Sequence, residues 1–173
     1  MMLETGEFRS PIGTIVLSAH DGALVALDFE EHWPRRLARL AARFGEIEWR
    51  RVKDPAGAGG RLAAYFAGDL HALDRLAVDA GGTPFQRRVW AALRRIPVGE
   101  TWSYQALARR IGAPAAVRAV GAANGANPVG IVVPCHRVIG ADGRLTGYAG
   151  GLERKRWLLA HERADTLEQR RLA

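Results

Sequence analysis

The order of apolar and polar residues predicts a small sheet near the start of the chain. Apolar positions run through residues 8–17 and 23–29, and Asp21 and Gly22 between them are typical of a hairpin turn. Residues 47–52 are a third candidate strand. Apolar side chains at helical spacing predict two helices, the first closed by Gly45. These side chains are Leu37, Leu40, Ala41 and Phe44 in the first helix, and Leu62, Tyr65 and Phe66 in the second.

Helical signals replace strand signals after Gly81 and Gly82. Thr83 is an N-cap residue, Pro84 suits the first helical position, and Gln86 completes a capping box. The helix that they begin is expected to end at residues 97–100. Its predicted buried positions are Phe85, Val89, Ala92 or Leu93, and Ile96. We therefore expect an α+β protein with a sheet-and-helix domain over residues 1–80 and a mainly helical domain over residues 81–173.

The second domain contains a predicted helix-turn-helix. Ser103 can cap a short helix that runs to about Arg110, and residues 111–113 form a tight turn. Pro114 is expected to open the second helix, which runs to about Asn124. One side of this helix carries Val117, Val120, Gly121 and Asn124, and the other carries Ala115, Arg118, Ala119, Ala122 and Gly125. So smooth a face suits close approach to a duplex groove, although it also suits packing against a neighbouring helix.

The charge is concentrated in the same second domain. Residues 1–80 carry ten basic and twelve acidic side chains, whereas residues 81–173 carry fifteen basic and six acidic ones, so the second domain has a net charge of +9. A basic region of this kind favours a nucleic acid, since binding to phosphates releases counterions. A solvated basic surface without a partner is the alternative interpretation.

Composition also limits the protein's location and its thiol chemistry. No apolar run approaches the ~20 residues that span a membrane, and the N-terminus lacks the features of a signal peptide. The single cysteine excludes an internal disulfide and a multi-cysteine zinc site. We therefore expect a cytoplasmic protein with no membrane association and with a reduced thiol.

That cysteine, Cys135, follows an apolar, strand-like run and precedes His136 and Arg137. A lone cysteine is most often an inert buried hydrophobic residue. Cationic or hydrogen-bonding neighbours favour the thiolate instead, which is the nucleophilic form. On a regular strand, His136 would point away from Cys135, so the two side chains could meet only across a turn or through a water molecule.

The segment Pro134-Cys135-His136-Arg137-Val138 resembles the active-site motif of the O6-alkylguanine-DNA alkyltransferases, also called methylated-DNA–protein-cysteine methyltransferases. The resemblance is strong over residues 83–162, whereas residues 1–80 are similar mainly in layout. The further matching motifs lie at residues 83–86, 104–108, 118–121, 127–128, 147–152 and 155–159, and at Glu162.

The resemblance implies the chemistry of the site. Cys135 is similar to the alkyl acceptor, and His136 with Glu162 is similar to the relay that activates it through a water molecule. Asn127 resembles the asparagine that braces the turn between the DNA-binding helix and the active-site strand. Transfer of the alkyl group to the Cys135 sulfur would give a permanent thioether, so each protein molecule repairs one base. Neither a cofactor nor a metal is implied.

The resemblance also implies a pocket for the guanine base. Tyr104 is similar to the phenol that donates to the departing purine. Val138, through its carbonyl group, is similar to one wall of the pocket. The remaining contacts are expected from Tyr148, Ala149 and Gly150. Ala149 stands where some family members have serine, but a backbone amide contact would survive that change.

The partner implied by the resemblance is double-stranded DNA containing O6-alkylguanine, bound through its minor groove by a monomer. Arg118 is similar to the arginine that fills the stack when the damaged nucleotide is extruded. Ala115, Ala119 and Ala122 are expected to line the same smooth face. O4-alkylthymine is a second candidate substrate.

Three other functions are alternatives to this one. A relative that binds alkylguanine without repairing it would replace the cysteine, which this chain retains. A helix-turn-helix regulator would carry base-reading polar residues on its second helix, where only Arg118 stands. A cysteine hydrolase or acyl transferase would need an oxyanion hole, and no motif for one is found.

Overall fold

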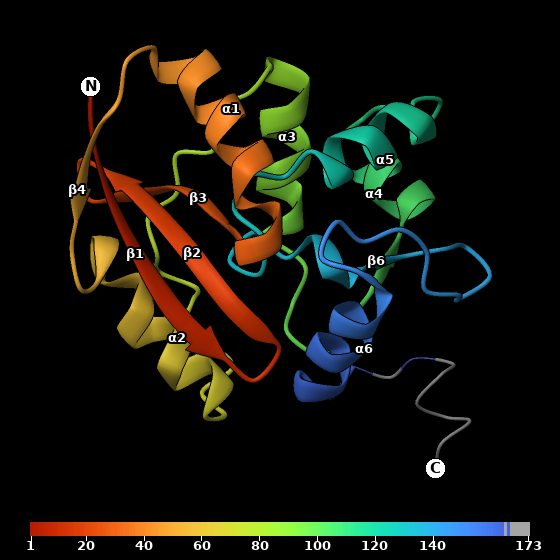
Figure 1. Cartoon of the computed structure of the whole chain (residues 1–173). Helices are drawn as coiled ribbons and strands as arrows, with labels where there is room; N and C mark the ends of the chain where they lie inside the picture. Colours follow the sequence, from red (N-terminus) through yellow and green to blue (C-terminus); the bar gives the residue numbers. More distant parts are fainter. Residues whose placement is uncertain (165, 167–173) are drawn as a thin grey trace. The chain divides into compact units, whose positions relative to one another are not determined.

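The computed structural model describes residues 1–164 and 166, and it has the mixed α+β architecture expected from the sequence (Figure 1). The chain divides into two compact units. The N-terminal unit comprises Met1–Gly81 together with Pro128–Gly130, and the C-terminal unit comprises Gly82–Asn127 and the chain from Ile131 onward. Within the described residues, no helix combines the length and the apolar character needed to cross a membrane.

The N-terminal unit is built on a four-stranded sheet with the order β3-β2-β1-β4. β1 (Met2–Ser10), β2 (Gly13–His20) and β3 (Ala23–Phe29) form an antiparallel meander, and β4 (Glu48–Arg51) pairs in parallel with β1. The predicted hairpin turn at Asp21 and Gly22 is confirmed, since both residues have positive φ angles, of 46° and 77°.

The single strand predicted over residues 8–17 is wrong, because a second hairpin turn divides it. Pro11 cannot donate a ladder hydrogen bond, and the chain reverses between Ser10 and Gly13. The Ser10 hydroxyl donates to the Gly13 carbonyl at 2.6 Å and closes the turn. Apolar residues on both sides of Pro11 made the two strands resemble one.

The sheet is accompanied by two helices and two short 3-10 turns. The turns are Glu30–His32 and Pro55–Gly57, and the helices are α1 (Trp33–Phe44) and α2 (Ala58–Phe66). Gly45 follows α1 with a φ of 73°, as its predicted role in closing the helix requires.

The face of α1 that packs inward differs from the predicted one. Leu40 is buried in a cluster with Leu3, Val25 and Ala26, but the predicted Leu37 and Ala41 are exposed. Arg36 is buried on the inner face because its guanidinium group pairs with the Asp28 carboxylate at 2.8 Å. An ion pair with another element thus places a charged residue where the apolar pattern predicted none.

The C-terminal unit is mainly helical. Its helices are α3 (Pro84–Leu93), α4 (Tyr104–Arg110), α5 (Val117–Gly125) and α6 (Leu152–His161). The two-residue strands β5 (Trp102–Ser103) and β6 (Val138–Ile139) pair in parallel. A 3-10 turn, Cys135–Arg137, leads directly into β6.

Local signals set the start of two of these helices. At α3, Thr83 accepts from the Gln86 amide, and the Gln86 side chain accepts from the Thr83 amide, which is the predicted capping box. At α4, the Ser103 hydroxyl accepts from the Ala106 amide at 3.0 Å. Trp90 was not among the predicted core residues, but it is buried. Its indole N–H donates to the Ala123 carbonyl at 2.8 Å and so connects α3 to α5.

Candidate active site and nucleic-acid interface

The only cysteine of the chain lies on a tight turn that is largely closed to solvent. Cys135 begins the 3-10 turn, and this residue is only 6% exposed. The expected strand before it is absent: residues 130–133 are turns and bends, and Ile131 has a φ of 68°. Strand geometry requires negative φ angles, so this left-handed residue breaks the apolar run. The Cys135 amide instead donates to the Val133 carbonyl at 2.8 Å.

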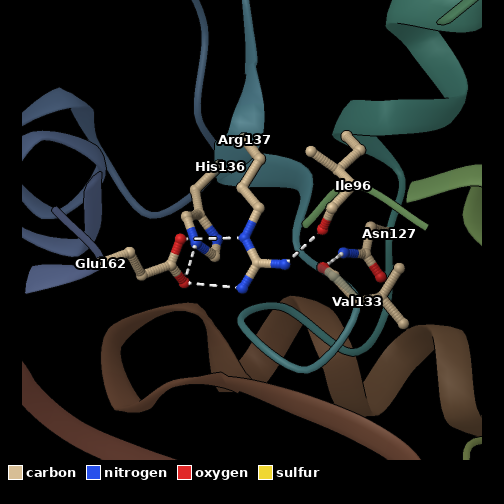
Figure 2. Close-up of polar contacts among 6 residues, drawn as sticks. All are labelled: Ile96, Asn127, Val133, His136, Arg137 and Glu162. Atoms are coloured by element: carbon tan, nitrogen blue, oxygen red, sulfur yellow. Dashed lines mark hydrogen bonds and ion pairs between the residues drawn. The ribbon is translucent and has the colours of Figure 1, made fainter. Parts of the chain in front are cut away.

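Two buried asparagines connect the end of α5 to this turn. The Asn127 side-chain amide donates to the Val133 carbonyl at 2.7 Å (Figure 2). The Asn124 side-chain amide donates to the carbonyl of Cys135 itself, at 3.4 Å. Asn127 was a predicted site residue, whereas Asn124 was predicted only to share one side of its helix with Val117, Val120 and Gly121. Both side chains therefore lie against the backbone on either side of the nucleophile candidate.

His136, Arg137 and Glu162 form a buried polar cluster (Figure 2). The first two directly follow Cys135 in the 3-10 turn. His136 Nε2 lies 2.8 Å from Glu162 Oε1. Arg137 donates through Nε and Nη2 to the two oxygens of the same carboxylate, each at 2.9 Å, and through Nη1 to the Ile96 carbonyl at 2.7 Å. The predicted pairing of His136 with Glu162 is thus present in the structure, and Arg137 is a third member that was not predicted.

The surroundings of Glu162 keep its carboxylate charged. Burial alone would raise the pKa of this carboxyl group. The charge of a protonated His136, the hydrogen bonds from His136 and Arg137, and the charge of Arg137 together hold the pKa well below its usual range. Glu162 is therefore an acceptor only, and it can stabilise positive charge on the imidazole.

Lys155 is a second buried cation in the C-terminal unit, after Arg137, and it was not among the predicted site residues. Its Nζ donates to the Val138 carbonyl at 2.6 Å and to the Thr146 carbonyl at 2.8 Å. Burial lowers the pKa of this ammonium to about 8, and electrostatic interaction with Cys135 opposes the shift. A usable signal was present: Lys155 stands three and four residues before Leu158 and Leu159, on the buried stripe of α6.

The predicted base-pocket residues lie around the carbonyl groups that Lys155 holds. Val138 is buried on β6, and the Tyr104 hydroxyl lies 3.5 Å from the Thr146 carbonyl. The Tyr148 ring meets the His136 ring edge-on, with 6.5 Å between their centroids. Ala149 is exposed and Gly150 is half-buried. These contacts bring Tyr104, Val138 and Tyr148 to the neighbourhood of the cysteine turn.

The face of α5 opposite the site is smooth and open to solvent. Arg118, Ala119, Ala122 and Gly125, which share the smooth side of the predicted helix, are all exposed. Arg118 forms no hydrogen bond or ion pair with any residue that the structure describes. The start of this helix was predicted wrongly: α5 begins at Val117, and Pro114 and the exposed Ala115 belong to a preceding turn. The Ala116 amide donates to the Ala113 carbonyl at 2.9 Å and closes that turn before the helix begins.

Exposed arginines are frequent on the other elements of the C-terminal unit. Arg88 of α3 donates to the Ile111 carbonyl and so supports the turn between α4 and α5. Arg110 lies over the Trp102 ring, 3.9 Å from its centroid. The exposed arginines on and around α3, α4 and α5 are Arg87, Arg88, Arg94, Arg95, Arg109, Arg110 and Arg118.

Comparison with known proteins assigns the chain to a family. Residues 84–164 match the profile described as 6-O-methylguanine DNA methyltransferase, DNA binding domain. A methylated-DNA–protein-cysteine methyltransferase of Salmonella typhimurium is 50% identical over 159 residues, which cover 90% of this chain and 93% of that protein. The protein of the same name from Mycolicibacterium paratuberculosis is 51% identical, covering 94% and 93%.

A solved structure supports the same assignment. The crystal structure of Mycobacterium tuberculosis OGT in complex with DNA matches with a TM-score of 0.76 and 44% sequence identity, over 94% of this chain and 93% of that one. The chain therefore belongs to the methylated-DNA–protein-cysteine methyltransferase family.

Proposed function

We propose that this protein repairs DNA by direct reversal, moving the alkyl group of O6-alkylguanine onto Cys135. The observation that carries the proposal is the position of the chain's only thiol, on a buried turn beside the His136–Glu162 pair. In the reaction, the thiolate attacks the alkyl carbon, an S–C bond forms, and the C–O6 bond breaks with its electron pair passing to guanine. Among the described residues, none beside the product is suited to hydrolysing a thioether, so each molecule acts once.

His136 is proposed as the base that generates the thiolate, through a water molecule. Because the Glu162 carboxylate only accepts, the hydrogen of the neutral imidazole lies on Nε2, which leaves the Nδ1 lone pair available. Nδ1 is buried and has no hydrogen-bond partner among the described residues. The thiol proton therefore passes to Nδ1 by way of water, and Glu162 stabilises the imidazolium that results.

The guanine is proposed to occupy a site formed by Tyr104, Val138 and residues 148–150. When the Cys135 thiolate attacks the carbon bound to O6, negative charge develops on the departing purine. A phenol hydrogen can neutralise this charge. Tyr104 begins α4, and its hydroxyl lies near the Thr146 carbonyl, within reach of this loop. The Val138 carbonyl and the backbone of Tyr148, Ala149 and Gly150 would supply the contacts to the base edge.

DNA is proposed to bind through its minor groove against the exposed face of α5. The small side chains of Ala115, Ala119 and Ala122 allow the duplex to approach closely, and the exposed arginines of the unit offer contacts to phosphates. Arg118, with no partner among the described residues, would fill the stack from which the damaged nucleotide is extruded. We infer a monomer located in the cytoplasm, with O4-alkylthymine as a second candidate substrate.

The experiment that tests this function weighs the intact protein after reaction with a duplex oligonucleotide containing O6-methylguanine. We expect a stoichiometric gain of one methylene equivalent, located on the peptide that contains Cys135. Cys135→Ser should show no gain while still binding the duplex. An unmodified wild-type protein, or a modified Cys135→Ser protein, would contradict the proposal.

A further inference from the structure

Asn124 is an unexpected residue at its position on α5. It is 5% exposed and shares the inner face of the helix with the buried apolar residues Val120 and Ala123. A buried amide is disfavoured unless its polar atoms are paired, and an apolar side chain would fill this position without that cost. The proximity of Asn124 to Cys135 therefore suggests a role in the site.

The hydrogen bond to Cys135 fixes the orientation of the amide. The Cys135 carbonyl can only accept, so the NH₂ group of Asn124 faces it, at 3.4 Å, and Oδ1 faces another direction. Oδ1 is buried and has no hydrogen-bond partner among the described residues. The only other such side-chain atom described in the C-terminal unit is His136 Nδ1. Both atoms thus belong to residues in direct contact with, or adjacent to, the nucleophile candidate.

We propose that Asn124 is a positioning residue that orients the relay water between the Cys135 thiol and His136. This inference rests on the proposed relay. The water donates one hydrogen to Asn124 Oδ1 and the other to His136 Nδ1, and its oxygen accepts from the thiol. Both O–H groups of the water are then engaged as donors, so a lone pair on its oxygen faces the S–H group of Cys135. A buried water with three such partners is typical of protein interiors.

The proton transfer balances in this arrangement. The thiol proton moves to the water oxygen while the water's hydrogen moves to Nδ1, which gives a thiolate, an imidazolium and a regenerated water molecule. Asn124 neither gains nor loses a proton. Its Oδ1 retains its hydrogen bond throughout, so the water cannot rotate its own hydrogen toward the sulfur and block the transfer.

The charged and titratable groups facing this site come from the cysteine turn, α6 and the loop before it. Arg137 shares the turn with His136, Lys155 lies on α6, and Glu162 is the residue that follows α6. The ring of Tyr148, in the loop before α6, contacts the His136 ring. Asn124 is neutral, so replacing it removes none of these charges. A change in pH dependence that follows its replacement therefore reports on proton transfer.

The test uses Asn124→Leu, which keeps the volume but removes both polar atoms. The rate of reaction with free O6-benzylguanine, followed by intact mass from pH 6 to pH 10, avoids any effect on DNA binding. We expect a loss of up to about a hundredfold at neutral pH, the cost typical of misplacing a reacting group by about 1 Å. The loss should disappear at high pH, where the thiol ionises without a base. Val120→Ala, on the same buried face, is the control for disturbed packing of α5.

Each outcome decides the question. A wild-type profile for Asn124→Leu, or the same loss at every pH and in Val120→Ala, overturns the proposal. If Asn124→Leu does not fold, the pair Asn124→Ser and Asn124→Ala replaces it, and equal profiles for these two overturn the proposal because only serine supplies an acceptor oxygen. His136→Gln separates the relay from the role of Asn124. If the pH–rate profile of His136→Gln matches that of wild type, the relay itself is overturned. If the profile of His136→Gln shifts but that of Asn124→Leu does not, only the role of Asn124 is overturned.

Discussion

Arg137 and Glu162 are joined by two parallel hydrogen bonds, Nε to Oε2 and Nη2 to Oε1, although 25 residues separate them in the sequence. This bidentate geometry is the strongest that arginine forms with a carboxylate. It gives Glu162 a permanent counter-charge, so the carboxylate stays ionised whether or not His136 is protonated. The relay proposed here therefore contains an ion pair as well as a base.

Glu162→Gln should lower the free energy of unfolding by about 3–5 kcal/mol at pH 7, because it leaves the buried Arg137 charge without its partner. The pKa of Glu162 is depressed in the folded protein, so its stabilisation is present above the ordinary value of ~4.3 and is lost as pH falls below it. In urea denaturation, the difference in free energy of unfolding between wild type and Glu162→Gln should shrink below pH 4. Glu153→Gln, at an exposed position of α6, is the control. A difference that is constant with pH would argue against an ionised pair.

His136→Gln should slow alkyl transfer at neutral pH by about 10²- to 10⁴-fold, the usual contribution of a positioned base. The rate should then rise with pH as an unassisted thiol ionises, and it should approach the wild-type rate in alkali. Single-turnover reaction with O6-benzylguanine across a pH series measures this. Retention of the wild-type rate and profile would show that His136 is not the base.

Arg118→Ala should slow repair of O6-methylguanine held in duplex DNA but should leave the reaction with free O6-benzylguanine nearly unchanged. The reason is that the free base needs no extrusion from a stack. The duplex reaction is measured at saturating DNA, so that weaker binding does not lower its rate, and the reaction with the free base is measured in parallel. Arg109→Ala, which removes an exposed arginine from α4, serves as the control for a lost phosphate contact, expected to reduce the salt slope of binding by about one unit. If Arg118→Ala slows both substrates equally, the extrusion role is excluded.

Lys155→Met should change how stability depends on pH above neutrality. The folded protein has a Lys155 pKa of about 8, below the ordinary value of 10.5, so between these values the unfolded chain binds more protons and stability rises with pH. From pH 8 to pH 10.5, the free energy of unfolding of wild type should therefore rise by on the order of 3 kcal/mol relative to that of Lys155→Met. Urea denaturation at the two pH values measures the gain, and Lys53→Met, at an exposed position, should show none. An unchanged difference would mean that the ammonium is not desolvated.

The features of the fold that could be predicted are those that depend on neighbours in the sequence. The capping box at Thr83 and Gln86, the glycine that closes α1 and the hairpin turn at Asp21 and Gly22 all depend on residues within four positions of one another. The errors at Pro11 and Pro114 have one cause. A proline marks a change of direction, but the pattern alone does not tell whether the chain turns before a helix, begins one or divides a strand.

The unpredicted parts of the candidate site come from contacts between distant segments. Family resemblance supplied His136 and Glu162, but the bond from Arg137 to Glu162 and the bonds from Lys155 to two carbonyls depend on how α6 packs against the cysteine turn. The left-handed conformation of Ile131 is of the same kind, because nothing in an apolar run indicates it. Such features follow from tertiary packing, which overrides local preference.

The N-terminal unit includes Pro128–Gly130, and this has a consequence for how the protein is made. The Leu27 amide donates to the Pro128 carbonyl at 2.9 Å, and the Leu27 carbonyl accepts from the Gly130 amide at 3.3 Å, at the outer edge of β3. Domains generally fold as they leave the ribosome, N-terminal first. Here that edge stays unpaired at Leu27 until Gly130 has been synthesised. Unpaired strand edges are templates for association with other chains, so nascent chains shorter than this should be the ones most dependent on chaperones.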